Sequence, residues 1–255
     1  MRHTLPIATT CLDRRLSRQV RFGPMDFSVS QIARMIDHSI LQPQFTLEDV
    51  RQGCAVAAKY QVASVCVRPS DVPLAVELLR GTDVRVGTVI GFPHGDTSTE
   101  VKAAETEQAV ARGASEIDMV INIGWLRSGD VAAVETEIKE IVRVAGEAHV
   151  KVILETAYLT DEEKLAACRA AERAGAAFVK TSTGFAPTGA TIDDLALMRS
   201  AVSAKVQVKA SGGIRGLDTL LAMAAVGVTR FGTSATEEIL EDLARRQATT
   251  YARRA

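Results

Sequence analysis

The run Arg-Ala-Gly-Ala-Ala-Phe-Val-Lys-Thr-Ser-Thr-Gly (173–184) decides the fold, because it contains a joint that the chain repeats. In this joint a helical segment ends at a glycine, a short apolar strand follows, and a loop of small residues comes next. Similar joints begin at Ala-Arg-Gly-Ala (111–114) and Ala-Val-Gly-Val (225–228). The glycine of each joint is expected to be a left-handed helix C-cap. These glycines are Gly113, Gly175 and Gly227.

From residue 27 onward, short β-branched runs alternate with alanine-rich helical stretches, a pattern typical of a parallel sheet with helical crossovers. Thr46 and Thr160 mark helix starts, since each is followed by acidic residues that suit the helix dipole. In the helix expected over 100–112, a small apolar stripe is expected at Val101, Ala104, Glu105, Gln108 and Ala111. Strands are expected near residues 36–40, 62–67, 84–90, 115–121, 150–155, 176–180, 205–210 and 228–232.

Eight such units favour an α/β fold, a closed (β/α)8 TIM barrel, since about 230 residues are available and such barrels typically have about 250. The main rival is a dinucleotide-binding sheet, and the first strand lacks the Gly-x-Gly-x-x-Gly run that this fold needs. No linker divides the chain, so residues 27–255 are expected to form one barrel domain with a short N-terminal helix. Residues 1–26, rich in arginine, are expected to be a disordered extension, with a transit peptide as the alternative.

Composition excludes several classes of function. The 255 residues carry 30 basic and 31 acidic side chains, a formal net charge of -1, so no global field favours nucleic acid or a membrane. The four cysteines lack a CxxC pair and the chain lacks a secretory leader, which favours a reducing cytoplasm. The four histidines have no metal-site spacing, so neither a metal nor a cofactor is expected. Exposed apolar helix faces would suit a homodimer.

Two lysines lie at matching positions of neighbouring expected strands. Lys180 and Lys209 each close a short apolar strand and lead into a small-residue loop. Lysine is rarely buried, and both burial and a second cation lower the pKa of an amine, leaving a neutral group that attacks carbonyls. The pair therefore predicts a Schiff-base site, although its two members cannot be ranked from the sequence pattern.

Other polar residues fall at the carboxyl ends of the expected strands, where barrels carry their active sites. Asp118 shares a strand face with Glu116 and is expected to transfer protons. Asp37, expected to end the first strand, and Glu155 either orient lysines or cap loops. Cys66 is expected to line the site by packing rather than to act as a nucleophile. The alternative for the charged residues is a buried ion-pair network that plugs the barrel.

Three glycine-containing loops follow the last three strands. They are Thr183-Gly184, Ser211-Gly212-Gly213 and Gly232-Thr233-Ser234. Late barrel loops often bind phosphate on backbone N–H groups and a helix N-terminus, although glycine after a strand is also ordinary turn chemistry. We expect a phosphorylated substrate here, with Arg215 either adding charge or staying solvated. The expected binding residues are Thr183, Gly184, Gly212, Gly213, Ser234 and Cys66.

Four runs resemble the family of deoxyribose-phosphate aldolases. They are Val-Gly-Thr-Val-Ile-Gly-Phe-Pro-His-Gly (86–95), Glu-Ile-Asp-Met-Val-Ile-Asn-Ile-Gly (116–124), Phe-Val-Lys-Thr-Ser-Thr-Gly (178–184) and Val-Lys-Ala-Ser-Gly-Gly-Ile-Arg (208–215). The resemblance extends from about Asp37 to Ser234. It implies a metal-independent class I aldolase on a (β/α)8 barrel, which reversibly cleaves 2-deoxy-D-ribose 5-phosphate to glyceraldehyde 3-phosphate and acetaldehyde.

The resemblance also implies roles for single residues. Lys180 would form the Schiff base, Lys209 would lower its pKa, and Asp118 would take part in proton transfer. Some family members have a phosphate-binding lysine where this chain has Phe185, so backbone contacts would carry more of the binding. Some members end in a tyrosine that joins the proton relay, whereas Tyr251 lies four residues before the end of this chain and is given no role.

Two other functions remain open. A phosphosugar isomerase or synthase on the same barrel would use the phosphate loops and need only acid and base groups. A barrel that only binds phosphorylated ligands would use its lysines as fixed charges, and its lysines would stay protonated near neutral pH.

Overall fold

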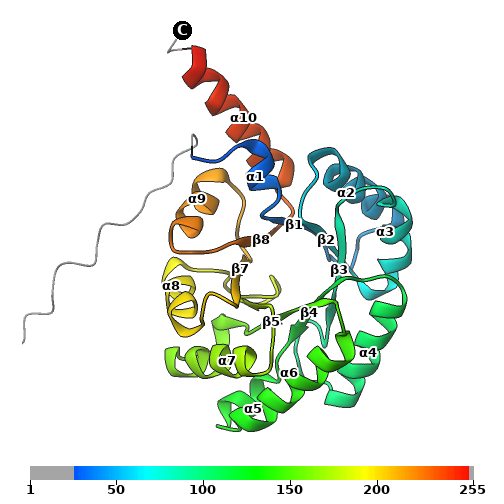
Figure 1. Ribbon diagram of the computed structural model, residues 1–255, viewed down its shortest axis with the longest axis vertical. Helices are drawn as coiled ribbons and strands as arrows, with labels where there is room; N and C mark the ends of the chain where they lie inside the picture. Colours follow the sequence, from blue (N-terminus) through cyan, green and yellow to red (C-terminus); the bar gives the residue numbers. More distant parts are fainter. Residues whose placement is uncertain (1–25, 253–255) are drawn as a thin grey trace, which may run out of the picture.

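The computed structural model describes residues 26–252, and its centre is a closed barrel of eight parallel strands in which β8 pairs with β1 (Figure 1). The expected extension of residues 1–26 lies, apart from Asp26, outside the described residues. The strands follow the chain order around the barrel. They are β1 (Ile36–Ile40), β2 (Ser64–Val67), β3 (Arg85–Ile90), β4 (Glu116–Val120), β5 (His149–Ile153), β6 (Phe178–Lys180), β7 (Gln207–Ser211) and β8 (Arg230–Thr233).

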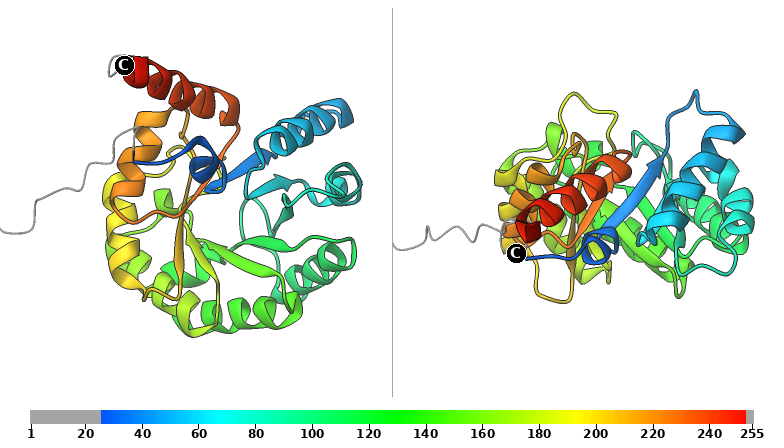
Figure 2. Two further views of the ribbon diagram at one scale, coloured as in Figure 1. Left: turned by 45° about the horizontal axis from the view of Figure 1, so that its top comes forward. Right: turned by 90° about the horizontal axis from the view of Figure 1, so that it is seen from above.

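Helices form a ring around the strands, as Figure 1 and the left view of Figure 2 show. The expected short N-terminal helix is present as α1, which packs beside the C-terminal α10, so the first and last described elements adjoin. The α-helices are α1 (Val29–Ala33), α2 (Leu47–Tyr60), α3 (Val72–Leu78), α4 (Thr99–Ala111), α5 (Ile123–Arg127), α6 (Val131–Ala145), α7 (Asp161–Arg173), α8 (Ile192–Ala201), α9 (Leu217–Ala225) and α10 (Thr236–Ala252). Short 3-10 turns η1 (Pro69–Asp71) and η2 (Thr156–Tyr158) follow β2 and β5.

The local signals read from the sequence are confirmed. Each of the eight expected strands is found, with ends that shift by at most two residues. The φ angles of Gly113, Gly175 and Gly227 are 99°, 87° and 94°, which is the left-handed region where a side chain would be strained. Thr46 and Thr160 cap α2 and α7, and each forms a capping box with an acid three residues later.

The two faces of each strand have different surroundings. On β4, Ile117 and Met119 point outward and join the aliphatic core between the strands and the helices. Glu116 and Asp118 point inward and are fully buried within the barrel. This alternation follows from the two-residue period of a strand. The barrel interior is therefore charged at a level where such barrels usually carry branched aliphatic side chains.

The prediction of an apolar stripe at Val101 on α4 is wrong, because a different face of the helix packs inward. Val101 is 46% exposed, and the helix instead buries Lys102, Thr106 and Ala109. Lys102 Nζ donates to the carbonyls of Gly95 and Val120 and to Glu137 on α6, at 2.8, 2.9 and 2.8 Å. The inward face of α4 is polar because it ties a loop, a strand end and a helix together, so the hydrophobic period misplaces it.

Two negative findings concern residues 26–252. None of the helices described there is both long and apolar enough to cross a membrane. In the same part of the chain, His, Cys, Asp and Glu side chains form no group of three or more that could hold a metal ion.

Candidate active site

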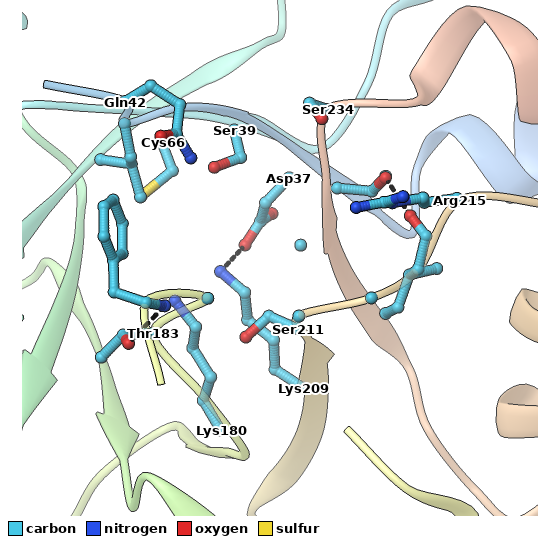
Figure 3. Close-up of a pocket in the computed structure, with 18 of the residues that line it drawn as sticks. Asp37, Ser39, Gln42, Cys66, Lys180, Thr183, Lys209, Ser211, Arg215 and Ser234 are labelled. Atoms are coloured by element: carbon cyan, nitrogen blue, oxygen red, sulfur yellow. Dashed lines mark hydrogen bonds and ion pairs between the residues drawn. The ribbon is translucent and has the colours of Figure 1, made fainter. Parts of the chain in front are cut away.

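A cavity of about 220 Å³ opens at the carboxyl ends of the strands. Figure 3 shows Lys180 and Lys209 pointing into it from β6 and β7, with Cys66 and Gln42 on one side and Ser234 and Arg215 on the other. Most of the residues expected to form the site line this cavity, Asp37 and Arg215 among them, whereas Asp118 and Glu155 do not. The others of the expected set that line it are Cys66, Lys180, Thr183, Gly184, Lys209, Gly212, Gly213 and Ser234.

The two lysines are neighbours in the barrel wall. β6 and β7 pair in a register that sets Lys180 opposite Lys209, so both side chains point inward at one level. Both are almost fully buried, with 3% and 1% of their surface exposed. Each ammonium group lies 2.7 Å from the same oxygen, Asp118 Oδ2. A single carboxylate thus joins the two amines at the floor of the cavity.

Asp118 lies beneath the lysines and does not line the cavity. Its side chain is fully buried and contacts Lys180, Lys209 and a third amine, that of Lys151, whose Nζ lies 3.0 Å from Asp118 Oδ1. Burial by itself raises the pKa of Asp118, but the ammonium groups of Lys151, Lys180 and Lys209 outweigh this effect and hold the pKa well below its usual range. Asp118 is therefore a carboxylate in the free protein.

Lys151 on β5 is a buried lysine that the sequence reading did not identify. Its Nζ contacts three carboxylates: Asp37 at 2.9 Å, Glu116 at 2.5 Å and Asp118 at 3.0 Å. The signal was present in Val-Lys-Val-Ile (150–153), where a lysine replaces an inward-facing apolar residue of a strand. Lys151 was overlooked because it lies in the middle of its strand rather than before a loop.

Asp37 lies deeper than expected. It is the second residue of β1, not the last, and Lys209 Nζ lies 2.5 Å from its Oδ2. Arg230 on β8 approaches the other oxygen at 2.7 Å, and Ser64 donates to that oxygen as well. Burial opposes ionisation of Asp37, but Lys151, Lys209 and Arg230 hold its pKa well below the usual value. Asp37 thus fixes Lys209, and β1 continues past it to Ile40.

The charges inside the barrel are unequal in number unless one lysine is neutral. Among the described residues, the interior ion pairs join three carboxylates to three lysines and one arginine. The carboxylates are Asp37, Glu116 and Asp118, and the cations are Lys151, Lys180, Lys209 and Arg230. An excess charge is costly where water is excluded, so the arrangement favours loss of one proton from one lysine.

Ion pairing ranks the lysines. Lys180 contacts one carboxylate, Asp118, which it shares, whereas Lys209 contacts two. Burial lowers the pKa of Lys180, and nearby Lys209 lowers it further against the opposing attraction of Asp118. For Lys209, burial is outweighed by Asp118 and Asp37, which raise its pKa. Lys180 is therefore the amine that most readily becomes a nucleophile.

Cys66 belongs to an apolar side of the cavity. It packs with Leu41 and Val89, with Phe92 alongside, and this cluster is separate from the main core. Phe185 continues the apolar side, because its ring meets Phe92 edge to face at 5.3 Å. Burial raises the pKa of the Cys66 thiol to about 11, so it stays a thiol at neutral pH and serves as a packing residue.

The opposite side of the cavity is built from three late loops. Gly184, Gly212 and Gly213 have φ angles of 90°, 85° and 81°, which turn the backbone sharply at the cavity wall. Gly212 also packs against the backbone of Gly189, where an added Cβ would lie 2.8 Å from a Cα atom. Ser234 lies just before α10, whose N-terminus carries a partial positive charge. Such backbone turns beside a helix N-terminus suit an anion.

Thr183 has a different environment from the glycines beside it. Its N–H donates to both carboxylate oxygens of Glu155, at 3.3 and 3.2 Å, and its hydroxyl donates to Glu155 as well. Glu155 is buried after β5 in the left-handed region, at φ 57°, which is uncommon for a residue with a side chain. Both donors of Thr183 are thus engaged within the protein, and Glu155 holds the 183–185 loop in place.

The fold and this cavity define a class of protein. The cavity contains a buried lysine of lowered pKa that contacts a carboxylate and lies beside a second lysine, at the carboxyl ends of the barrel strands. This arrangement is typical of enzymes that attack carbonyl compounds with a lysine amine. The chain belongs to the DeoC/LacD aldolase family, whose model matches residues 23–235.

Relatives of this chain share most of its length. It is 53% identical over 210 residues to deoxyribose-phosphate aldolase of Bacillus mycoides, covering 82% of this chain and 94% of the relative. It is 50% identical over 218 residues to the enzyme of that name from Caldanaerobacter subterraneus, covering 84% and 94%. The tetrameric deoxyribose phosphate aldolase structure from Aeropyrum pernix superposes with a TM-score of 0.77 at 33% identity, covering 84% and 92%.

Proposed function

We propose that the protein is a class I aldolase that reversibly cleaves 2-deoxy-D-ribose 5-phosphate to glyceraldehyde 3-phosphate and acetaldehyde. The observation that carries this proposal is the position of Lys180, whose amine opens into the cavity and lies 2.7 Å from Asp118. The relatives described above, named as deoxyribose-phosphate aldolases, support the substrate. A phosphosugar isomerase or synthase would leave this buried lysine pair without a covalent task.

The reaction begins when the neutral amine of Lys180 adds to C1 of the open-chain sugar. Lys209, held as an ammonium by Asp37 and Asp118, donates a proton as the carbinolamine loses water to give the Schiff base. The protonated imine then draws electrons from the C2–C3 bond. That bond breaks as the C3 hydroxyl loses its proton, which releases glyceraldehyde 3-phosphate and leaves an enamine on Lys180.

Asp118 is the group placed to move these protons. It is a carboxylate that contacts both lysines. It can therefore accept a proton from either ammonium group and return it during formation and hydrolysis of the Schiff base. Protonation of the enamine at C2 and hydrolysis then release acetaldehyde and restore the amine.

The phosphate is assigned to the loop side of the cavity. Gly184, Gly212, Gly213 and Ser234 supply backbone and hydroxyl groups near the N-terminus of α10, and Arg215 adds a nearby positive charge. Thr183 could donate to phosphate only if its pairing with Glu155 opened. With Phe185 on the apolar side, the loop backbone carries the recognition.

The homodimer and the cytoplasmic location expected from the sequence stay predictions. For the homodimer, the molar mass in solution is the measurement that decides.

The test is product analysis with 2-deoxy-D-ribose 5-phosphate in the presence of a metal chelator. We expect acetaldehyde and glyceraldehyde 3-phosphate in equal amounts, at a rate that the chelator does not change. The unphosphorylated sugar is expected to react with a much higher KM. A product that keeps all five carbons would instead support the isomerase or synthase, and binding without turnover would support the ligand-binding barrel.

A further inference from the structure

Below the cavity floor lies a second layer of charge that no substrate can reach. Lys151 and Glu116 are fully buried, lie on neighbouring strands and line no part of the cavity. They are joined by a contact of 2.5 Å between Lys151 Nζ and Glu116 Oε2. The mechanism given above uses neither residue.

The layer is connected to the reacting lysine through shared carboxylates. Lys151 contacts Asp118 Oδ1, and Asp118 Oδ2 contacts Lys180. Lys151 also contacts Asp37, which in turn contacts Lys209. A change in charge at Lys151 therefore reaches the amine of Lys180 through one intervening carboxylate, Asp118, and a change at Glu116 reaches it through Lys151 and Asp118.

We propose that Lys151 and Glu116 are positioning residues for the aldolase reaction, which set the charge balance that frees Lys180 to act as an amine. This inference rests on the proposed function. Lys151 neutralises carboxylate charge that would otherwise bind a proton on Lys180, and Glu116 limits how much positive charge accumulates beneath the site. The two residues act in opposite directions on the same amine.

The titratable and charged groups that face Lys180 and Lys151 come from several elements of the barrel. Lys180 faces Asp118 from β4, Lys209 from β7, Cys66 from β2 and Glu155 after β5. Lys151 faces Asp37 from β1, Glu116 and Asp118 from β4, Lys209 from β7 and Arg230 from β8, with the Phe178 ring at 5.9 Å. At the far rim Arg85 contacts Glu116 at 3.4 Å and His149 at 3.0 Å, and is half exposed, so solvent screens it.

Burial makes these charges effective. Lys151 carries a raised pKa, because its carboxylates outweigh the cost of burial, so it stays an ammonium wherever the enzyme works. Burial raises the pKa of Glu116, but Lys151 and Arg230 overcome this and lower it, so it stays a carboxylate. Two opposite and permanent charges near a titrating amine must shift its titration in opposite directions.

The experiment compares Lys151→Met, Glu116→Gln and the double variant through the pH profile of kcat/KM for 2-deoxy-D-ribose 5-phosphate. The acid limb of that profile reports the amine that must be neutral. Lys151→Met removes a positive charge and is expected to move the limb about one to two pH units upward. Glu116→Gln removes a negative charge and is expected to move it downward by a similar amount. The double variant should return close to the parent.

The matched control is Glu137→Gln, which removes a buried carboxylate paired with a lysine in the helical layer and should leave the limb in place. A purely structural role would lower activity without moving the limb. Shifts of the same sign, no shift, or a double variant that fails to return would each overturn the proposal. Should Lys151→Met fail to fold, Glu116→Gln alone still tests the downward shift.

Borohydride reduction in the presence of acetaldehyde separates this proposal from the proposed function. Failure to label Lys180 in the parent protein would remove the aldolase mechanism itself. Labelling of Lys180 in every variant, with unmoved acid limbs, would overturn only the roles of Lys151 and Glu116.

Discussion

Two of the regions that bury lysine in the described part of the chain, the helical layer around Lys102 and the barrel interior around Lys180, surround its charge with different partners. Between α4 and α6, Lys102 meets one carboxylate, Glu137, and two carbonyl oxygens. Inside the barrel, Lys180 meets a carboxylate that it shares with Lys151 and Lys209. The Lys102 ammonium has three acceptors and no access to the cavity, whereas the Lys180 amine opens into the cavity.

The pKa values of the buried carboxylates in the two regions are shifted in opposite directions. Burial raises the pKa of Glu137 against the single attraction of Lys102, and burial lowers the pKa of Lys102. In the barrel, Asp118 is surrounded by three ammonium groups, and its pKa is lowered in spite of burial. Burial of a lysine is thus not evidence of catalysis by itself. The number of carboxylates that share it, and its access to a cavity, decide its role.

The largest expected effect separates the two regions by activity. Lys180→Met should reduce kcat by on the order of 10⁴-fold or more, because the covalent step is lost, and should leave the affinity for inorganic phosphate nearly unchanged. Lys102→Met should keep a kcat close to that of the parent in the fraction that stays folded. Steady-state kinetics and phosphate inhibition measure both. Equal loss of turnover and phosphate affinity in Lys180→Met would mean that this lysine only supports the fold.

The next effect concerns the free energy of unfolding, for which Lys102 matters even though it does not matter for activity. Lys102→Met is expected to cost about 3–5 kcal/mol of unfolding free energy, because Glu137 is left buried without its cation. The double variant Lys102→Met with Glu137→Gln should recover part of that loss. Urea unfolding gives the four values of this cycle. Additive losses would show that the pair is not coupled.

Ser234 on the loop side provides a smaller test. Ser234→Ala is expected to raise KM for 2-deoxy-D-ribose 5-phosphate by about 10-fold with little change in kcat, because a hydrogen bond to a charged group is lost. Ser200→Ala, in a helix away from the cavity, is the control. If KM for the unphosphorylated sugar rises by the same factor, Ser234 does not contact the phosphate.

The pH dependence of stability gives the smallest effect and the clearest sign. The pKa of Glu116 is lowered in the folded state, so its contribution is present above about pH 4 and is lost as the pH falls through the lowered value. The pKa of Glu137 is raised, so its contribution is present at low pH and is lost as the pH rises through the raised value. Unfolding free energies of Glu116→Gln and Glu137→Gln, each subtracted from the parent across pH, should therefore change in opposite directions. Parallel changes would contradict this contrast between the regions.

Much of the barrel could be predicted from the sequence because its signals are local. Glycine caps such as Gly175 and threonine caps such as Thr160 act over three or four residues. The positions of Lys180 and Lys209 follow equally from short strands of fixed alternation. Asp118 was expected to transfer protons, and its inward direction follows from the same alternation.

What the sequence did not yield depends on contacts between distant segments. The inward face of α4 is polar because Lys102 reaches Glu137, 35 residues later, so the helical period misplaces that face. The depth of Asp37 depends on Arg230, 193 residues away. Lys151 resembled an ordinary strand residue until the closed barrel placed it among three carboxylates. The residue pattern alone did not rank Lys180 over Lys209; the family resemblance implied that order, and the count of carboxylate partners gives it a physical reason.

Lys180 contacts fewer carboxylates than Lys209 or Lys151 inside the barrel, and we therefore propose it as the nucleophile. Reduction with borohydride in the presence of acetaldehyde, followed by peptide mass analysis, tests this proposal directly. We expect an N-ethyl group on Lys180 and none on Lys209, Lys151 or Lys102. An N-ethyl group on Lys209 instead, or no adduct on a protein that remains folded, would contradict it.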